Sequence, residues 1–204
     1  MERKLLIIGA GGHGKVCAEI AKKMDRWKEI LFYDDKLVGN VNGINIVEKE
    51  FFQSLKDTVD YFVAIGNNEI RFEKTKKLLS MGCNIVSLID PTSVISKFST
   101  IGIGTVVMPK TVINASTKIG DGVIINTGSV IDHDSHIGSY AHLSPNSTIT
   151  GGCKIGDFVW VGSTTTVINQ AEIVSKTLIG AMSLVNKDIK EAGTYFGIPA
   201  EKRS

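Results

Sequence analysis

The sequence predicts two folds in succession: an α/β, Rossmann-like parallel sheet over residues 1–90 and a parallel β-helix over residues 91–204. Strand-like and helix-like patterns alternate over the first part, where a glycine-rich turn follows the first strand. From Ile89 to Val185, every sixth residue is aliphatic, without a break over seventeen positions. A period of six differs from the 3.6 residues of a helical turn and is typical of hexapeptide-repeat β-helices.

The first part has the element order of a small open parallel sheet. We expect helices over residues 14–24 and 69–81 and strands over residues 4–8, 30–33, 61–65 and 84–89. Strands that alternate with helices are typical of a Rossmann-type sheet. The boundary falls near Asp90-Pro91, because proline ends the last strand and the six-residue pattern takes over.

The six-residue unit predicts a prism of stacked coils. A short strand points one branched aliphatic side chain inward, and small or polar residues occupy the bend that follows. Glycines at intervals of 18 residues indicate that three units close one coil, as at Gly102, Gly120, Gly138 and Gly156. Parallel strands stack about 4.8 Å apart, so nearly six coils give a prism about 27 Å tall. A β-sandwich is the weaker alternative, since nothing in a sandwich fixes such a period.

Composition and charge exclude several classes of partner. The 204 residues carry a formal net charge of +2 with scattered Lys and Arg, so we expect no nucleic-acid partner. The apolar run over residues 5–8 is too short for a membrane span or a signal peptide, so we expect no membrane partner and a cytoplasmic location. Cys17, Cys83 and Cys153 are odd in number and far apart, which predicts buried thiols.

A nucleotide site is predicted at the carboxyl edge of the first sheet. Residues 9–14 match the G-x-G-x-x-G pattern, in which backbone N–H groups at a helix N-terminus bind a pyrophosphate. Asp34 and Asp35 follow the second strand, and Gly66 opens the turn after the third. Only about half of a dinucleotide-binding fold fits here, so a mononucleotide or nucleotide sugar fits better. The alternatives are a turn used only for packing and a solvated strand end.

A cluster of histidines lies on the predicted prism, over residues 133–142. No two of these histidines are separated by a multiple of 18 residues, so converging zinc ligands are not expected and we predict no metal. His133 lies between Asp132 and Asp134, and a carboxylate on one ring nitrogen makes the other nitrogen a better proton acceptor. Gly151 follows one coil later, where its N–H is suited to stabilise an oxyanion. The alternative is that His133 is a surface corner residue.

His142 lies nine residues after His133, half a coil away. The two histidines can therefore share a ligand only if the ligand bridges two subunits. A homotrimer with active sites at its interfaces follows, and His136 is expected to help fill that interface.

Five motifs together resemble a known family. They are residues 9–14, 33–35, 64–71, 126–133 and 196–200, and Gly66-Asn67-Asn68-Glu69 is the most discriminating stretch. Over almost its whole length the sequence resembles the bacterial hexapeptide-repeat acetyltransferases that act on nucleotide-linked amino sugars. The likeness is strongest to the UDP-4-amino-sugar N-acetyltransferases of UDP-N,N'-diacetylbacillosamine biosynthesis, in the sialic acid O-acetyltransferase-like group. The left-handed sense of the predicted β-helix is implied by this resemblance.

The resemblance also implies the reaction and its residues. Acetyl-CoA would acetylate the 4-amino group of a UDP-linked 2-acetamido-4-amino-2,4,6-trideoxy sugar, with His133 as the base. Asp134 would raise the basicity of His133, although the relatives carry glutamate there, and Gly151 matches the oxyanion position. The residues implied to hold the UDP-sugar are Gly11, Gly12, His13, Asp34, Asp35 and Gly66. Those implied to line the acetyl-CoA groove are His142, Ser163 and Ala181, the last two through their backbone.

Three alternatives remain open from the sequence. A sialic acid O-acetyltransferase has the same two-domain plan, and a GDP-perosamine N-acetyltransferase would use a different nucleotide. From another class, the chain could be a non-catalytic nucleotide-sugar binding module. An intact His133 with its carboxylate argues against the binding module.

Overall fold

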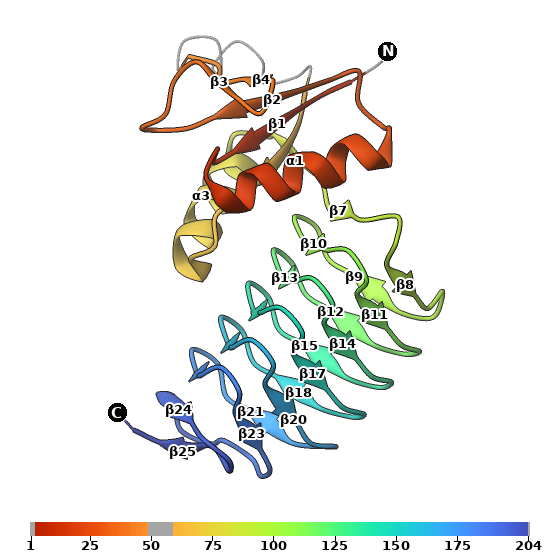
Figure 1. The fold of residues 1–204 in the computed structure, drawn as a ribbon, viewed down its shortest axis with the longest axis vertical. Helices are drawn as coiled ribbons and strands as arrows, with labels where there is room; N and C mark the ends of the chain where they lie inside the picture. Colours follow the sequence, from red (N-terminus) through yellow and green to blue (C-terminus); the bar gives the residue numbers. More distant parts are fainter. Residues whose placement is uncertain (1–2, 49–58, 204) are drawn as a thin grey trace. The chain divides into compact units, whose positions relative to one another are not determined.

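The chain folds into two compact units, Met1–Pro91 and Thr92–Ser204. The computed structural model describes residues 3–48 and 59–203. The first unit holds a parallel sheet with helices, and the second is a stack of β-coils (Figure 1). The predicted fold class, a Rossmann-like parallel sheet followed by a left-handed parallel β-helix, is confirmed.

Within the described residues, the sheet of the first unit has four parallel strands in the order β2-β1-β5-β6. Their bounds are β1 Lys4–Ile8, β2 Glu29–Tyr33, β5 Val59–Val63 and β6 Asn84–Ile85. The central strand β1 contributes Leu5, Leu6 and Ile7, whose side chains have no exposed surface. Such a continuous apolar run is typical of a parallel strand that is covered on both faces.

Two helices begin directly after strands of this sheet. Helix α1 spans Gly12–Met24, and the N-cap residue before it, Gly11, offers no side-chain cap, so the first N–H groups of the helix stay open. Helix α3 spans Asn68–Ser80, and Asn67 caps it by accepting a hydrogen bond from Ile70 N at 2.9 Å. Both helices lie where the apolar spacing predicts them, with starts one or two residues earlier.

Three details of the first unit differ from the prediction. The strand predicted over residues 61–65 lies two residues earlier in the chain, as β5. The strand predicted over residues 84–89 is wrong as one element, because it forms two short strands, β6 and β7 (Leu88–Ile89). Only Asp60 and Tyr61 of β5 pair with β6, so this ladder ends early. An unpredicted hairpin joins β3 (Asn40–Val41) and β4 (Ile44–Asn45). Its turn residues, Asn42 and Gly43, both have positive φ. The Asn-Gly dipeptide is the strongest short hairpin signal in a sequence.

The second unit has three strand faces, named here after β14, β15 and β16. The β14 face contains β8 Val94–Ile95, β11 Val112–Ile113, β14 Val130–Ile131, β17 Thr148–Ile149, β20 Thr166–Val167 and β23 Leu184–Val185. The β15 face contains β9 Thr100–Ile101, β12 Lys118–Ile119, β15 His136–Ile137, β18 Lys154–Ile155 and β21 Glu172–Ile173. The β16 face contains β10 Val106–Val107, β13 Ile124–Ile125, β16 His142–Leu143, β19 Trp160–Val161, β22 Leu178–Ile179 and β24 Thr194–Phe196.

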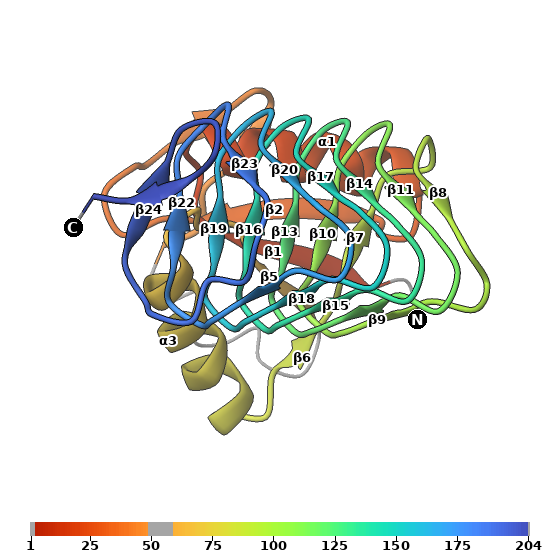
Figure 2. The ribbon, with the colours of Figure 1, turned by 90° about the horizontal axis from the view of Figure 1, so that it is seen from below.

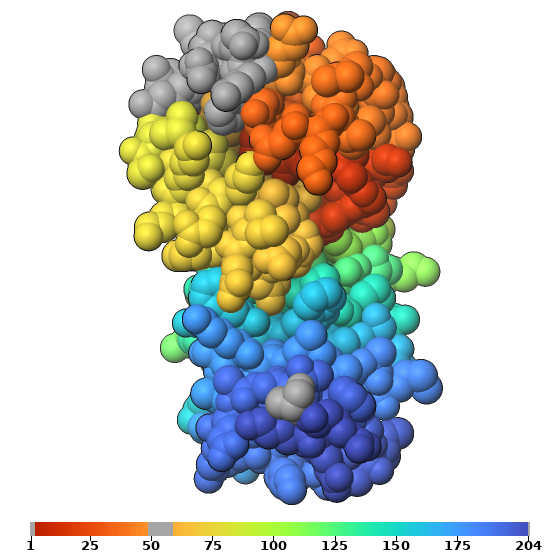
Figure 3. Space-filling view, turned by 90° about the vertical axis from the view of Figure 1, so that its left-hand side faces the viewer, coloured from red at the N-terminus to blue at the C-terminus, as the bar shows by residue number. Residues whose placement is uncertain are grey.

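Each coil pairs in register with the next, 18 residues later, as at Ile131↔Ile149 and Leu143↔Val161 (Figure 2). The inward aliphatic residues from Val107 to Val185 are at most 5% exposed. Ile95 and Ile101 are only partly buried, because they belong to the first coil of the unit, which has a neighbouring coil on one side only. In the space-filling view the atoms of successive coils meet without gaps (Figure 3).

The corners of the prism use two different devices. The third residue after each inward aliphatic from Ile101 to Ile179 adopts positive φ, and most of these residues are not glycine, for example Asp134 at 58° and Asn146 at 57°. The glycines at 18-residue intervals serve a different purpose, close approach. A Cβ on Gly138 would lie 2.5 Å from the backbone N of Asp157 on the next coil. These glycines are therefore required by stacking rather than by backbone angle.

Candidate active site

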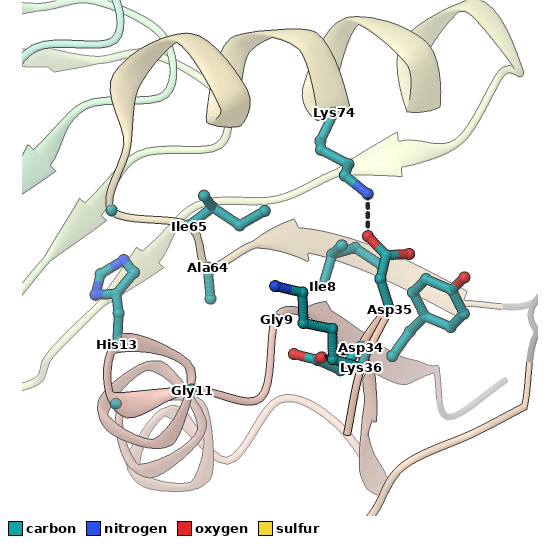
Figure 4. Close-up of a pocket in the computed structure, with 13 residues that line it drawn as sticks. Ile8, Gly9, Gly11, His13, Asp34, Asp35, Lys36, Ala64, Ile65 and Lys74 are labelled. Atoms are coloured by element: carbon teal, nitrogen blue, oxygen red, sulfur yellow. Dashed lines mark hydrogen bonds and ion pairs between the residues drawn. The ribbon is translucent and has the colours of Figure 1, made fainter. Parts of the chain in front are cut away.

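A cavity of about 380 Å³ lies at the carboxyl ends of β1, β2 and β5 in the first unit (Figure 4). It is lined by the turns after these three strands and by Lys74 of α3. All six residues predicted to hold the nucleotide sugar line it: Gly11, Gly12, His13, Asp34, Asp35 and Gly66. The carboxyl edge of a parallel sheet is where such folds bind ligands, so the location agrees with a nucleotide site.

The glycines of the first turn divide into two kinds. Gly9 has φ of 105°, and a Cβ on Gly14 would lie 2.0 Å from the carbonyl oxygen of Gly9, so these two serve the turn itself. A Cβ on Gly11 or Gly12 would meet nothing within 4 Å. Both line the cavity at the N-terminus of α1, where open N–H groups and the helix dipole favour an anion.

Asp34 holds the glycine turn in place. Its Oδ2 accepts a hydrogen bond from Ala10 N at 2.9 Å, and its Oδ1 accepts from Lys36 N at 2.9 Å and Leu37 N at 3.0 Å. Partial burial raises the pKa of Asp34, but these N–H donors and the charge of Lys36 outweigh it and lower the pKa overall. Both carboxylate oxygens are thus already occupied in shaping the site.

Asp35 forms an ion pair with Lys74 at the same cavity, with 2.6 Å between Oδ2 and Nζ (Figure 4). The hydrogen bond from Lys74 is the largest influence on Asp35 and lowers its pKa. The sequence motifs did not indicate Lys74 or Lys36, because both lie outside the glycine pattern. Lys36 follows Asp35 directly in the chain, but Lys74 reaches the cavity only through the packing of α3.

His13 is a neutral side chain in this structure. Burial, with a smaller contribution from the nearby positive charge of Arg71, lowers its pKa to about 4. Its ring contacts the Sγ of Cys17, one helical turn later, at 3.7 Å from Nε2. A neutral imidazole at this wall of the cavity can donate or accept one hydrogen bond to a ligand without adding charge.

The Gly66-Asn67-Asn68-Glu69 stretch is organised by the buried side chain of Arg71, which is 1% exposed. Its Nη1 donates to Ile65 O at 2.9 Å and Gly66 O at 3.1 Å, and its Nη2 donates to Asn68 Oδ1 at 2.9 Å. The motif therefore fixes the turn that carries Gly66. Asn67 caps α3 and Asn68 accepts a hydrogen bond from Arg71, while Gly66 lines the cavity.

In the second unit, His133 has the geometry of a general base. Its Nδ1 lies 2.8 Å from Asp134 Oδ2, which fixes a proton on Nδ1 and leaves Nε2 as the acceptor. The hydrogen bond with Asp134 is the largest influence on the pKa of His133, and with the charge of Asp132 it raises that pKa above its ordinary value. The imidazole is exposed at a corner of the prism between the β14 and β15 faces.

Gly151 lies directly against His133. A Cβ at this position would be 2.8 Å from both Cε1 and Nε2 of the imidazole, so the absence of a side chain leaves room at the reactive nitrogen. Gly152 N donates to His133 O at 2.9 Å, which holds the two corners in register. The structure thus brings together all three residues predicted for catalysis: His133, Asp134 and Gly151.

The residues predicted to line the acetyl-CoA groove lie elsewhere on the prism. His142 is on β16, while Ser163 and Ala181 follow β19 and β22 at the next corner, and Met182 N donates to Ser163 O at 2.9 Å. The His142 ring stacks on Trp160 with centroids 5.2 Å apart, a contact that the sequence patterns did not indicate. This group occupies a different face from His133, as the half-coil separation predicts.

Residues 3–48 and 59–203 contain no group of three His, Cys, Asp or Glu side chains that could hold a metal ion. Among the helices of these residues, none combines the length and apolar character needed to cross a lipid bilayer.

Comparison with known proteins matches each of the two units to a known family. Residues 4–78 match the family model of the PglD N-terminal domain, and residues 116–151 match that of bacterial transferase hexapeptide repeats. The acetyltransferase domain of PglB from Neisseria gonorrhoeae FA1090, solved in complex with acetyl coenzyme A, is 36% identical, with a TM-score of 0.96 and complete coverage of both chains. The chain belongs to this family of hexapeptide-repeat acetyltransferases. The family resemblance predicted from the motifs is therefore confirmed.

Two other relatives of this acetyltransferase carry more specific names. PerB from Caulobacter crescentus, solved in complex with CoA and GDP-perosamine, is 33% identical with a TM-score of 0.93, covering 98% of this chain and 97% of PerB. The UDP-N-acetylbacillosamine N-acetyltransferase of Bacillus subtilis (strain 168) is 33% identical over 116 residues. That match spans about half of this chain (52%) and about half of the curated relative's length (51%).

Proposed function

We propose that this protein transfers the acetyl group of acetyl-CoA to the 4-amino group of a UDP-linked 2-acetamido-4-amino-2,4,6-trideoxy sugar. The observation that carries the proposal is the arrangement at His133, where Asp134 holds Nδ1 and Gly151 leaves Nε2 open. Membership in a family of acetyltransferases supports it, as do the relatives named for nucleotide-linked amino sugars.

The first unit would bind the nucleotide. Gly11 and Gly12 present open backbone to a diphosphate at the N-terminus of α1, and Gly66 and His13 line the same cavity. Asp35 and Lys74 supply an acceptor and a donor side by side for the polar groups of a base or ribose. The contribution of Asp34 would be to hold the glycine turn in its binding conformation.

The second unit would carry the chemistry. The amine nitrogen attacks the thioester carbon, the new C–N bond forms, and His133 Nε2 takes a proton from the nitrogen. The backbone N–H of Gly151 would stabilise the oxyanion of the tetrahedral intermediate. The C–S bond then breaks, and the imidazolium returns its proton to the CoA thiolate. Because a neutral amine is a competent nucleophile, positioning contributes together with base catalysis.

The complete site would need two copies of the chain. His133 is at the corner between the β14 and β15 faces, whereas His142, Ser163 and Ala181 lie on the β16 face and the corner after it. A homotrimer would bring one copy's His133 to the acetyl-CoA groove of its neighbour. The outward residues of the β14 face support such packing, because all are aliphatic or threonine: Val94, Val112, Val130, Thr148, Thr166 and Leu184.

A thiol-release assay with acetyl-CoA tests the proposal. The acceptors are a panel of UDP-amino-sugars, GDP-perosamine and free sialic acid, and the UDP-4-amino sugar is expected to give the highest kcat/KM. His133→Ala should lower turnover by about 10²-fold or more, in line with general-base contributions. Near-normal transfer by this variant would contradict the role of His133, and ligand affinity without thiol release would indicate a binding module.

A GDP-linked amino sugar is the second candidate. The fold of PerB, solved with GDP-perosamine, matches this chain over 98% of its length. A preference for GDP-perosamine in the same assay would select this candidate over the UDP-sugar. Transfer to sialic acid alone would instead select an O-acetyltransferase.

We also propose a cytoplasmic location. The cysteines of the described residues, Cys17, Cys83 and Cys153, are all buried thiols outside any disulfide, which is typical of proteins from reducing compartments.

A further inference from the structure

The carboxylate of Asp132 is held from two sides beside the candidate base. Its Oδ1 accepts a hydrogen bond from Asn114 Nδ2, one coil earlier, at 2.8 Å and another from the backbone N of His133 at 2.8 Å. Its Oδ2 lies 4.0 Å from His133 Nε2, too far for a hydrogen bond between them. One oxygen thus fixes the carboxylate, and the other faces the space beside the reactive nitrogen.

This space is bordered by two acceptors. Asp134 Oδ2 accepts a hydrogen bond from Nδ1–H of His133, so Nε2 carries a free lone pair, and Asp132 Oδ2 is a carboxylate oxygen. For a nitrogen placed about 2.9 Å from both acceptors, the acceptor–nitrogen–acceptor angle would be roughly 90°. This is near enough to the tetrahedral angle for two N–H groups to donate, one to each acceptor. An amine has two such donors and an ammonium three, whereas a hydroxyl has only one O–H.

We propose that Asp132 binds the acceptor amine and selects amine over hydroxyl acceptors. Asn114 is the residue that positions the carboxylate of Asp132 for this role. This inference rests on the proposed function, because it assigns a partner to the acceptor of that reaction. When the nitrogen attacks the thioester, it gains positive charge as the C–N bond forms. Asp132 Oδ2 stabilises this charge through one N–H, while another proton passes to His133 Nε2.

A hydroxyl acceptor fits the same place less well. Its single O–H must go to Nε2 for base catalysis, which leaves Asp132 Oδ2 facing an oxygen lone pair. Two acceptors facing each other repel, and the carboxylate gains no donor from the substrate. The hydrogen bonds from His133 N and Asn114 lower the pKa of Asp132, so it is ionised where the enzyme would work. Asp132 therefore favours the positive charge that develops on an attacking amine nitrogen.

The test uses the full-length chain with Asp132→Asn. An amide oxygen retains the acceptor for Asn114 and for the backbone N of His133, while the second oxygen becomes an NH₂ group. We expect kcat/KM for the amino sugar to fall about 10- to 100-fold, the usual value of a charge-assisted hydrogen bond. The inhibition constant of the matching UDP-sugar with a 4-hydroxyl group should change little.

Two more variants separate binding from folding. Asn114→Ala should reduce kcat/KM for the amine in the same direction but less, with the affinity for the hydroxyl analogue retained. Asp157→Asn is the matched control, because this aspartate caps Ser139 N at 2.7 Å on another corner and should leave the kinetics unchanged. Equal losses for amine and hydroxyl ligands in Asp132→Asn, or wild-type kinetics, would overturn the inference.

The outcomes also distinguish this inference from the proposed function. If the wild type prefers GDP-perosamine, the nucleotide assignment fails, and the same comparison is made on that amine. If the wild type acetylates a hydroxyl acceptor as efficiently as an amine, the selectivity assigned to Asp132 is wrong although acetyl transfer stands.

Discussion

At the scale of single residues, His133 is surrounded by carboxylates that act on different atoms of its ring. Asp134 bonds Nδ1 at 2.8 Å, and Asp132 lies on the side of Nε2. Both raise the pKa of His133, with the Asp134 hydrogen bond as the largest cause and the charge of Asp132 next, while desolvation acts in the opposite direction. A base must be unprotonated to work, so a raised pKa moves the acidic limit of activity to higher pH.

Asp134→Asn tests this pH dependence. The amide oxygen can still accept from Nδ1–H, but the negative charge is lost, so the pKa of His133 should fall toward its ordinary value. We expect the acidic limb of the kcat/KM profile to move to lower pH and the plateau to fall, because the base is weaker. The measurement is a pH–rate profile with Asp157→Asn as control. An acidic limb that does not move would show that His133 does not set it.

Part of this residue-level detail can be predicted from sequence patterns. Adjacent His133 and Asp134 predict a base and its partner, and the 18-residue period places Gly151 against the imidazole. Lys74 meets Asp35 across 39 positions of sequence, and no period relates them. Such pairs follow from the packing of a helix on a sheet, which local patterns do not encode.

At the scale of the element, each coil depends on glycines that let backbones approach. A Cβ on Gly138 would lie 2.5 Å from Asp157 N and 2.6 Å from Gly156 C, and backbone atoms cannot move aside as a flexible side chain can. The restriction is steric, because φ at Gly138 is outside the left-handed region.

Gly138→Ala should therefore destabilise the coils by about 1–3 kcal/mol, the usual cost of overpacking. Gly66→Ala is the matched control, because a Cβ there meets nothing within 4 Å. Thermal denaturation followed by circular dichroism would measure both variants. A melting temperature for Gly138→Ala equal to that of Gly66→Ala would contradict the steric account.

Element prediction worked best where the period is strict. The six-residue run fixed the strands of the prism, and helical spacing located α1 and α3. The β3–β4 hairpin was not predicted, although Asn42-Gly43 signals it, because the flanking strands are only two residues long. The residues of β6 and β7 lie in one mostly aliphatic stretch, residues 84–89, with no glycine or proline between them. The two strands are separate because the pairing of β5 with β6 ends at Ile85.

At the scale of the whole molecule, the two groups of predicted catalytic and acetyl-CoA residues lie on different corners of one prism. His133 follows β14 and Ala181 follows β22, so the two residues lie at different corners of the prism. The proposed trimer makes each active site a property of two neighbouring chains. Sequence spacing indicated this separation, whereas the packing face that we propose is inferred from the outward residues of the β14 face.

Mixing two inactive variants tests this shared site. His133→Ala removes the base, and Ala181→Trp fills the proposed groove at an exposed position, so each alone should be inactive. After joint unfolding and refolding, random assembly gives about one interface in four with both native partners, and activity should return to about that level. Variants refolded separately and then combined provide the control. No recovery in the jointly refolded sample would place the whole site within one chain.

The last turn of the prism differs from all the others. Strand β25 (Glu201–Lys202) runs antiparallel to β24, and both of its residues are charged and exposed. A stack of parallel coils would otherwise present a free row of amide and carbonyl groups, ready to template another molecule. The antiparallel final strand interrupts the parallel stacking of the coils, so it should disfavour end-to-end association into fibres.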